Sequence, residues 1–268
     1  MRAKKSLGQN FLKSKQAVRD MTAVACLSTE DVVLEVGPGR GILTEALLQC
    51  AKRVIAVEKD ELLVMFLQEK FAKEIMLGKL EIVSGDILEF NPASYNLKTL
   101  SYKLVANIPY YITGQFLRKF LSGEAQPKTI AVMLQKEVAR RIMARDNKES
   151  ILSISVKVYG TPSYVASVPK KYFSPEPKVD SAIILIDNIN RDFFKDIGEE
   201  KFFQVLHAGF AHKRKFLIRN LSTVASREAL EKNFDSHKIP EKSRAEDITL
   251  IEWQFIVASI IQDKSETK

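Results

Sequence analysis

The segment 32-VVLEVGPGRGILTEALLQCA-51 joins an apolar run to a predicted helix through a turn that contains three glycines. Its first five residues include three valines and a leucine, which is typical of a β-strand buried on both faces. Glycines at positions 37, 39 and 41 interrupt this run, and a helix is predicted over 42–51. A strand that passes through a glycine turn directly into a helix is the beginning of a β-α unit.

The rest of the first half of the chain repeats this order of strand and helix. Each predicted strand is a nearly continuous apolar run, and each is followed by a helix or a loop. The pattern predicts an α/β fold of the Rossmann-like type, with a mostly parallel sheet covered on both faces. The predicted strands are 53–58, 80–85, 103–107 and 129–134, and the other predicted helices are 16–27, 60–73, 114–121 and 136–145.

The pattern changes after residue 150. The segments 153-SISVKVYG-160 and 163-SYVASV-168 predict an antiparallel hairpin around Gly160-Thr161-Pro162, and 181-SAIILI-186 predicts a further strand. Beyond Asp187 the apolar spacing is helical to the end of the chain. We therefore expect two domains, a sheet domain over 1–188 and a small all-helical domain over 189–268.

Composition indicates an ordinary globular protein, with 46% hydrophobic and 28% charged residues in a chain of 268. No run approaches the ~18 apolar residues of a membrane span. Cys26 and Cys50 show no metal-ligand spacing, as do the three histidines, so we expect core thiols, no metal and a reducing cytoplasmic location. No heptad or apolar interface stripe stands out, so we expect a monomer.

The net charge of +8 is concentrated in three clusters of Lys and Arg. Any one of them could be no more than a solvated surface. Together they favour a polyanionic partner such as a nucleic acid. The clusters are Arg2, Lys4, Lys5, Lys13 and Lys15; Lys136, Arg140, Arg141, Arg145 and Lys148; and Lys213, Arg214, Lys215 and Arg219.

The glycine turn has the spacing G-x-G-x-G, one residue shorter than the dinucleotide fingerprint G-x-G-x-x-G. Glu58 ends the second strand, 19 residues after Gly39, where a carboxylate can accept both hydroxyls of a ribose. Asp86 ends the third strand, where it can accept from an adenine amino group. Either acid alone is more often a surface residue, but consecutive strand ends meet in one crevice. A nucleoside without phosphates fits this pattern, and S-adenosylmethionine is such a ligand.

The fourth strand ends in 107-NIPY-110, and here the chain resembles adenine-N6 methyltransferases that act on ribosomal RNA. It is most similar to the bacterial 16S rRNA adenine dimethyltransferase family. The resemblance extends over nearly the whole chain, in the same order. Its other motifs are 8-GQNFL-12, 134-LQKEVARR-141, 173-FSPEPKVDSA-182 and 210-FAHKRKFLIRNL-221.

The resemblance implies S-adenosylmethionine as the cofactor and a role for each matching residue. One departure from the family is 149-ESILS-153, where relatives often carry Tyr-Gly-Arg-Leu-Ser, and it predicts a different local loop. By resemblance, Asn10 and the Leu12 backbone close over the methionine part of the cofactor, Gly37 lies against that part, Glu58 holds the ribose, Asp86 holds the adenine, and Asn107 lies between cofactor and target base.

The target amine would then face 107-NIPY-110. The Asn107 side-chain oxygen and the Ile108 carbonyl can accept its two N–H groups, and Pro109 stiffens the turn that aims them. Tyr110 can stack on the base, and the resemblance places Phe173 on the other face of the base. The alternatives are that Asn107 caps a turn and that both aromatics belong to the core. For Tyr111 we expect core packing.

The function implied by the resemblance is dimethylation of two adjacent adenines in a hairpin near the 3′ end of 16S rRNA, on the immature 30S subunit. Arg140, Arg141, Lys213, Arg214 and Lys215 are the expected RNA contacts. Two alternatives stay open: a 23S rRNA methyltransferase of the macrolide-resistance type, and an rRNA-binding assembly factor without activity. The segment 213-KRKFLIRN-220 favours the first function over the 23S enzyme, and the complete cofactor pattern argues against an inactive protein.

Overall fold

The computed structural model describes residues 3–4 and 7–266, and the chain divides into two units. The sheet unit consists of the residues up to Ala139 together with Gly160–Ile189. The helical unit consists of Arg140–Tyr159 together with the residues from Asn190 onward. The predicted domains, 1–188 and 189–268, stay a prediction; the two units divide the chain differently, because the helical unit also includes Arg140–Tyr159.

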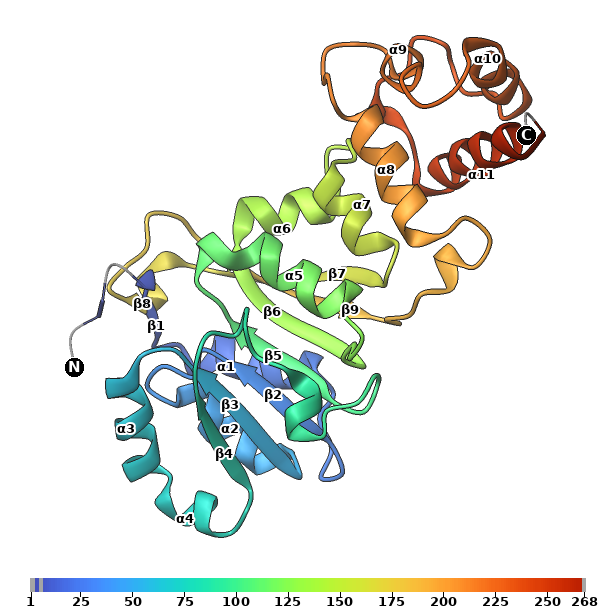
Figure 1. The fold of residues 1–268 in the computed structure, drawn as a ribbon. Coiled ribbons are helices and arrows are strands. Elements are labelled where there is room, and N and C mark those ends of the chain that lie inside the picture. Colours follow the sequence, from blue (N-terminus) through green and yellow to red (C-terminus); the bar gives the residue numbers. More distant parts are fainter. Residues whose placement is uncertain (1–2, 5–6, 267–268) are drawn as a thin grey trace. The chain divides into compact units, whose positions relative to one another are not determined.

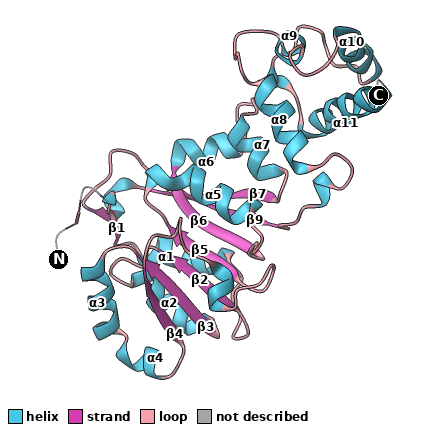
Figure 2. Cartoon of the chain, viewed as in Figure 1, coloured by secondary structure: helices cyan, strands magenta, loops and turns pink. Residues whose placement is uncertain are grey.

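The sheet unit is built on seven strands in the order β4-β3-β2-β5-β6-β9-β7, shown in magenta in Figure 2. The first five strands of this order are parallel, and β9 runs antiparallel to both of its neighbours. The predicted Rossmann-like, mostly parallel sheet with an antiparallel strand is confirmed. The strands are β4 (Leu80–Ser84), β3 (Arg53–Glu58), β2 (Val32–Val36), β5 (Lys103–Asn107), β6 (Thr129–Gln135), β9 (Ser181–Asp187) and β7 (Thr161–Val168).

Helices α1 and α2 supply much of the sheet's core. Met21 of α1 and Leu47 of α2 are completely buried in one cluster with Val54 of β3 and Val105 of β5. Burial of each such side chain is worth about 1.5–3 kcal/mol. The helices of this unit are α1 (Lys15–Val24), α2 (Ile42–Cys50), α3 (Glu61–Lys70), α4 (Ala72–Met76), α5 (Thr113–Ser122) and the first residues of α6 (Lys136–Ile142).

A separate two-stranded sheet ties the N-terminal segment to the loop before β9. β1 (Phe11–Leu12) pairs antiparallel with β8 (Phe173–Ser174), with Leu12 opposite Phe173, and the two strands lie side by side in Figure 1. The backbone N–H of Lys13 extends the contact by donating to the carbonyl of Tyr172 at 2.8 Å. Two motifs about 160 residues apart in sequence thus meet.

The predicted strand over 153–160 is wrong. These residues belong largely to helix α7 (Ile151–Lys157), and the antiparallel hairpin is formed by β7 and β9 instead. Alternating Ser and apolar residues imitate the period of a strand, but a capping box starts a helix. The Ser150 hydroxyl accepts from the Ser153 N–H at 3.1 Å, and the Ser153 hydroxyl accepts from the Ser150 N–H at 2.7 Å.

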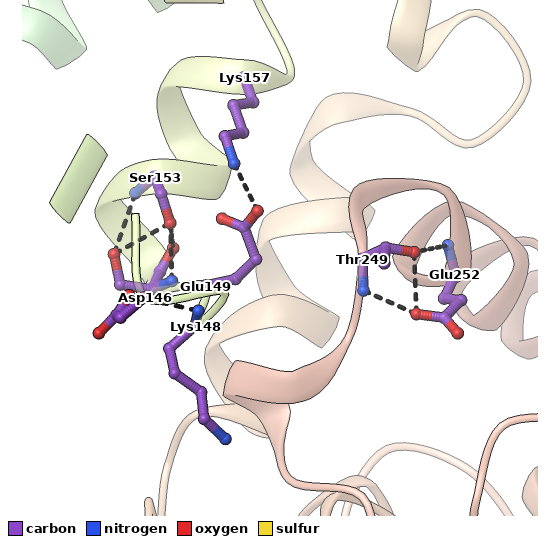
Figure 3. Close-up of polar contacts among 8 residues, drawn as sticks. Asp146, Lys148, Glu149, Ser153, Lys157, Thr249 and Glu252 are labelled. Carbon is purple, nitrogen blue, oxygen red and sulfur yellow. Dashed lines mark hydrogen bonds and ion pairs between the residues drawn. The ribbon is translucent and has the colours of Figure 1, made fainter. Parts of the chain in front are cut away.

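The family departure 149-ESILS-153 supplies both this cap and an ion pair. Glu149 accepts from Lys157 of α7 (Figure 3). The Glu149 N–H donates to the Glu246 carbonyl at 2.7 Å. Thr249 and Glu252 cap the start of α11 (Leu250–Glu266) in the same view. The bond from Glu149 to Glu246 joins two segments of the helical unit, and whether the loop differs from that of relatives stays a prediction.

The helical unit packs around Trp253, which is completely buried. The Trp253 ring lies so close to Gly209 that an added Cβ there would sit 2.4 Å from it, so only glycine fits at this point. Besides α7, the helices are α8 (Glu199–Gly209), α9 (Leu217–Leu221), α10 (Arg227–Ser236) and α11 (Leu250–Glu266).

Both cysteines are free, and the prediction of a core thiol is wrong for Cys26. Cys26 is exposed because it lies in the turn after α1 at a φ of 45°, whereas Cys50 is half-buried. Among the described residues, no helix has the length and apolar character needed to cross a membrane. Within the same residues, no group of three His, Cys, Asp or Glu side chains could hold a metal ion.

Candidate functional site

A cleft opens in the sheet unit where β2, β3, β4 and β5 end. Parallel strands present their carboxyl ends at the same edge of a sheet, so four separate chain segments meet here. Residues 7–12 form another wall. All of the residues predicted to bind cofactor line this cleft: Asn10, Leu12, Gly37, Glu58, Asp86 and Asn107.

The glycine turn brings its backbone against β5. The Gly37 N–H donates to the Val57 carbonyl at 3.0 Å, and Gly37 has a φ of +69°. A Cβ at this position would lie 3.3 Å from the Asn107 carbonyl oxygen. The turn therefore needs glycine for both its conformation and its close approach.

Glu58 accepts two backbone N–H groups at the bottom of the cleft. Its Oε2 accepts from Gly39 at 3.1 Å and its Oε1 from Asp60 at 2.9 Å. Burial raises the pKa of Glu58, and these hydrogen bonds counteract the rise. Each carboxylate oxygen can accept a second hydrogen bond, so the group still has the capacity to bind a pair of ribose hydroxyls.

Asp86 is already paired, which the sequence did not indicate. Its Oδ2 accepts from the Lys59 ammonium at 2.7 Å and its Oδ1 from the Leu88 N–H at 2.9 Å. Burial alone would raise the pKa of Asp86, but Lys59 and Leu88 outweigh it and lower that pKa. Asp86 is thus an ionised acceptor with spare lone pairs.

Asn107 ends β5 with a half-buried side chain that makes no hydrogen bond to any described residue. The following Ile108 is buried, and Pro109 has an extended conformation at φ −58° and ψ 134°. Polar groups in such positions are normally paired. An unpaired amide facing a cleft is therefore available to a ligand.

The aromatic residues near Asn107 differ in how they reach the cleft. Tyr110 is half-buried, and its hydroxyl bonds to Ser181 Oγ at 2.7 Å. Phe173 is only 3% exposed, so it touches the cleft from within the core, and its stacking on a base stays a prediction. The core packing expected for Tyr111 is wrong, because this residue is 62% exposed at the cleft.

Glu35 is a buried titratable residue close to the glycine turn, and sequence reasoning missed it. It stands on β2, two residues before Gly37, and is completely buried. Burial raises the pKa of Glu35 to about 8, the Thr44 hydroxyl acts against this rise, and the Glu58 charge adds to it. No hydrogen bond of ordinary geometry joins Glu35 to Thr44 or to another described residue. Glu35 is thus a neutral acid at pH 7.

Glu35→Gln is expected to flatten the pH dependence of stability. Between about pH 4.5 and 8 the folded state keeps a proton that the unfolded state has lost, so stability falls as pH rises through this window. The loss is at most about 1.4 kcal/mol per pH unit. Thermal unfolding of both proteins from pH 5.5 to 8.5 measures it. Parallel curves for wild type and variant would contradict a proton on Glu35.

The predicted RNA contacts lie outside the cleft. Arg140 and Arg141 are exposed in the helical unit at the end of α6, and Lys213, Arg214 and Lys215 are exposed in the loop before α9. Of the N-terminal cluster, Arg2 and Lys5 lie outside the described residues. Lys4 forms an ion pair with Asp60 at 2.7 Å.

Comparison with known proteins identifies the class that this fold and site define. The sequence profile of the ribosomal RNA adenine dimethylase family matches residues 1–262. The chain belongs to this family, as its motifs predicted.

Two relatives show how far the similarity extends. The ribosomal RNA small subunit methyltransferase A of Dehalococcoides mccartyi is 40% identical over 258 residues, covering 96% of this chain and 88% of the relative. The protein of the same name from Fusobacterium nucleatum is 36% identical and covers 92% of this chain and 93% of its own.

Solved structures share the fold at lower identity. A dimethyladenosine transferase from Plasmodium falciparum superimposes with a TM-score of 0.82 at 22% identity, over 95% of this chain and 98% of its own. The 23S rRNA methyltransferase ErmE has a TM-score of 0.79 at 24% identity, over 94% of this chain and 100% of its own. The fold is therefore shared with a 23S rRNA methyltransferase and with a dimethyladenosine transferase, and the fold alone does not select a substrate.

Proposed function

We propose that this protein transfers methyl groups from S-adenosylmethionine to the N6 amines of two adjacent adenines near the 3′ end of 16S rRNA. The observation that carries the proposal is the unpaired Asn107 amide at the fourth strand end, beside Gly37, Glu58 and Asp86 in one cleft. Family membership and the relatives named for the small subunit support it.

The cleft fits a nucleoside cofactor without phosphates. Gly37 has no side chain that would keep a ligand away from the backbone. Glu58 and Asp86 stand at the ends of neighbouring parallel strands, and each carboxylate can accept further hydrogen bonds. Glu58 would hold the ribose, Asp86 the adenine, and Asn10, Leu12 and Gly37 the methionine part. When bound, S-adenosylmethionine supplies a methyl group activated by its sulfonium.

The residues 107–110 would prepare the amine. The exocyclic nitrogen of adenine is a poor nucleophile because its lone pair is delocalised into the ring. The Asn107 side-chain oxygen and the Ile108 carbonyl can accept its two N–H groups and thereby favour a tetrahedral nitrogen. Tyr110, fixed by its hydrogen bond to Ser181, can stack on the base, and Phe173 can contact the other face. Catalysis of this kind depends on positioning.

The small-subunit substrate is favoured over the large subunit by sequence similarity. Relatives at 36–40% identity bear the small-subunit name, whereas ErmE is similar at 24%. A substrate in the immature 30S particle would place the enzyme in the cytoplasm, and we propose that it acts as a monomer.

Mapping of methylated nucleotides tests the proposal. The protein is incubated with S-adenosylmethionine and either unmodified 30S subunits or naked 23S rRNA. Dimethylation of two neighbouring adenines near the 3′ end of 16S rRNA is expected, with no product on 23S rRNA. Methylation of 23S rRNA alone would favour the alternative enzyme. If the protein binds 30S subunits but forms no product, and calorimetry detects no binding of S-adenosylmethionine, the protein would be an assembly factor without activity.

We propose that the exposed loop before α9 contacts the phosphates of the RNA backbone. The double substitution Lys213→Glu/Arg214→Glu is expected to weaken binding of 30S particles. The slope of log affinity against log salt concentration should become shallower by about 1 for each lost phosphate contact. Affinity for S-adenosylhomocysteine should stay unchanged, because neither residue lines the cleft. Binding assays at several salt concentrations measure this. Unchanged RNA affinity at moderate salt would exclude this surface.

A further inference from the structure

Asp60 lies two residues after Glu58 and holds several parts of the cleft wall together. Its Oδ1 accepts from the Lys4 ammonium at 2.7 Å and from the Leu62 N–H at 3.2 Å, and its Oδ2 accepts from Gln9 Nε2 at 2.9 Å. The residue is only 4% exposed. Burial alone would raise the pKa of Asp60, but the bonds from Lys4 and Gln9 outweigh it and lower that pKa. The carboxylate is therefore ionised, and both of its oxygens accept hydrogen bonds.

Gln9 closes the N-terminal segment on itself and fixes its own orientation. Its Oε1 accepts from the Lys4 backbone N–H at 2.7 Å, while its Nε2 donates to Asp60. The Leu7 N–H also donates to the Lys4 carbonyl at 3.1 Å. Because the Gln9 oxygen faces a donor and the Gln9 nitrogen faces an acceptor, the side-chain amide satisfies both contacts in only one orientation.

The segment held in this manner covers the cleft. Residues 7–12 line it, and the Phe11 ring lies against the glycine turn, 3.2 Å from the point where a Cβ of Gly39 would be. The Asp60 N–H meanwhile donates to Glu58 Oε1 at 2.9 Å. Asp60 thus connects the acid that would hold the ribose with the segment that would cover the methionine part.

We propose that Asp60 is a positioning residue that fastens the N-terminal segment over the bound cofactor through Lys4 and Gln9. We call these contacts the Asp60 anchor. The inference rests on the proposed cofactor site, but it assigns to Asp60 no contact with cofactor or RNA. The anchor keeps Asn10 and Leu12 in place and slows release of the ligand.

Two single substitutions break the anchor without changing the shape of either side chain. Asp60→Asn keeps the cap of α3, because Asn is as good an N-cap as Asp. In either orientation, however, the amide nitrogen introduced at position 60 faces another donor. That donor is Gln9 Nε2 on one side, and the Lys4 ammonium and the Leu62 N–H on the other. Gln9→Glu places a second carboxylate against Asp60. Glu61→Gln is the matched control, since Glu61 is exposed on the same helix.

The double variant restores the pairing with donors and acceptors exchanged. In Gln9→Glu/Asp60→Asn, the carboxylate introduced at position 9 can accept from both the Lys4 N–H and the amide introduced at position 60. The net charge of this variant equals that of the wild type. A role in folding alone would not predict this recovery of ligand affinity. The cycle therefore measures the coupling between the two positions.

The test measures the affinity and dissociation rate of S-adenosylhomocysteine by calorimetry and stopped flow, with thermal unfolding of the free proteins as a control for folding. Each single variant is expected to bind roughly tenfold more weakly, as for loss of one charge-assisted hydrogen bond. The double variant should return to within about threefold of wild type. Wild-type affinity in both single variants, or a double variant no better than either, would overturn the anchor. No binding by the wild type would overturn the cofactor assignment as well.

Discussion

Asn107→Ala is expected to lower kcat for methylation of 30S subunits by about 100-fold or more, the range seen when one preorganised polar group is removed from a reacting centre. The Asn107 amide has no partner among the described residues, so its loss leaves no protein group unsatisfied. Folding should therefore be little affected. Affinity for S-adenosylhomocysteine should stay within a few-fold, because Glu58 and Asp86 remain.

Single-turnover rates with saturating cofactor measure this effect directly. Gln115→Ala is the matched control, since Gln115 is an exposed amide on the neighbouring helix α5 and does not line the cleft. Full turnover by the Asn107 variant would exclude Asn107 as an acceptor for the target amine. A loss of cofactor affinity as large as the loss of rate would mean that Asn107 binds the cofactor and not the target adenine.

Glu58→Ala is expected to weaken cofactor binding by about 100-fold, from two hydrogen bonds to a carboxylate at about 1.5 kcal/mol each. The effect should appear in the Kd of S-adenosylhomocysteine, measured by calorimetry. Glu61→Ala, three residues further on and exposed, is the control. Wild-type affinity in the Glu58 variant would contradict its assignment to the ribose.

The same residue gives cofactor binding a pH dependence. Burial raises the pKa of Glu58 above its ordinary 4.5. In the proposed complex the ribose hydroxyls would donate to the ionised carboxylate. Affinity for S-adenosylhomocysteine should thus fall as pH is lowered through that raised pKa, with uptake of a proton by the free enzyme. Glu58→Gln should abolish the dependence. An identical pH profile in wild type and this variant would assign the titration to another group.

Local sequence determined the strands, the turns and the residues at the strand ends. Apolar runs bounded by Gly37, Glu58, Asp86 and Asn107 specify a parallel sheet, and the geometry of such sheets brings these ends to one edge. That argument needs no knowledge of packing. The family motifs extended it to the N-terminal segment, which indeed forms a wall of the cleft.

Only the tertiary structure decided which of these groups are paired and which are free. Burial of Glu35 and the contact of Asp60 with Lys4, 56 residues away, depend on packing between distant segments. The helix at 151–157 likewise depends on Ser150 and on contacts within the helical unit, against an alternating pattern that favours a strand. Sequence periodicity reports which face of an element is apolar, but the charge state and the partners of a polar group are set by what is brought against it in space.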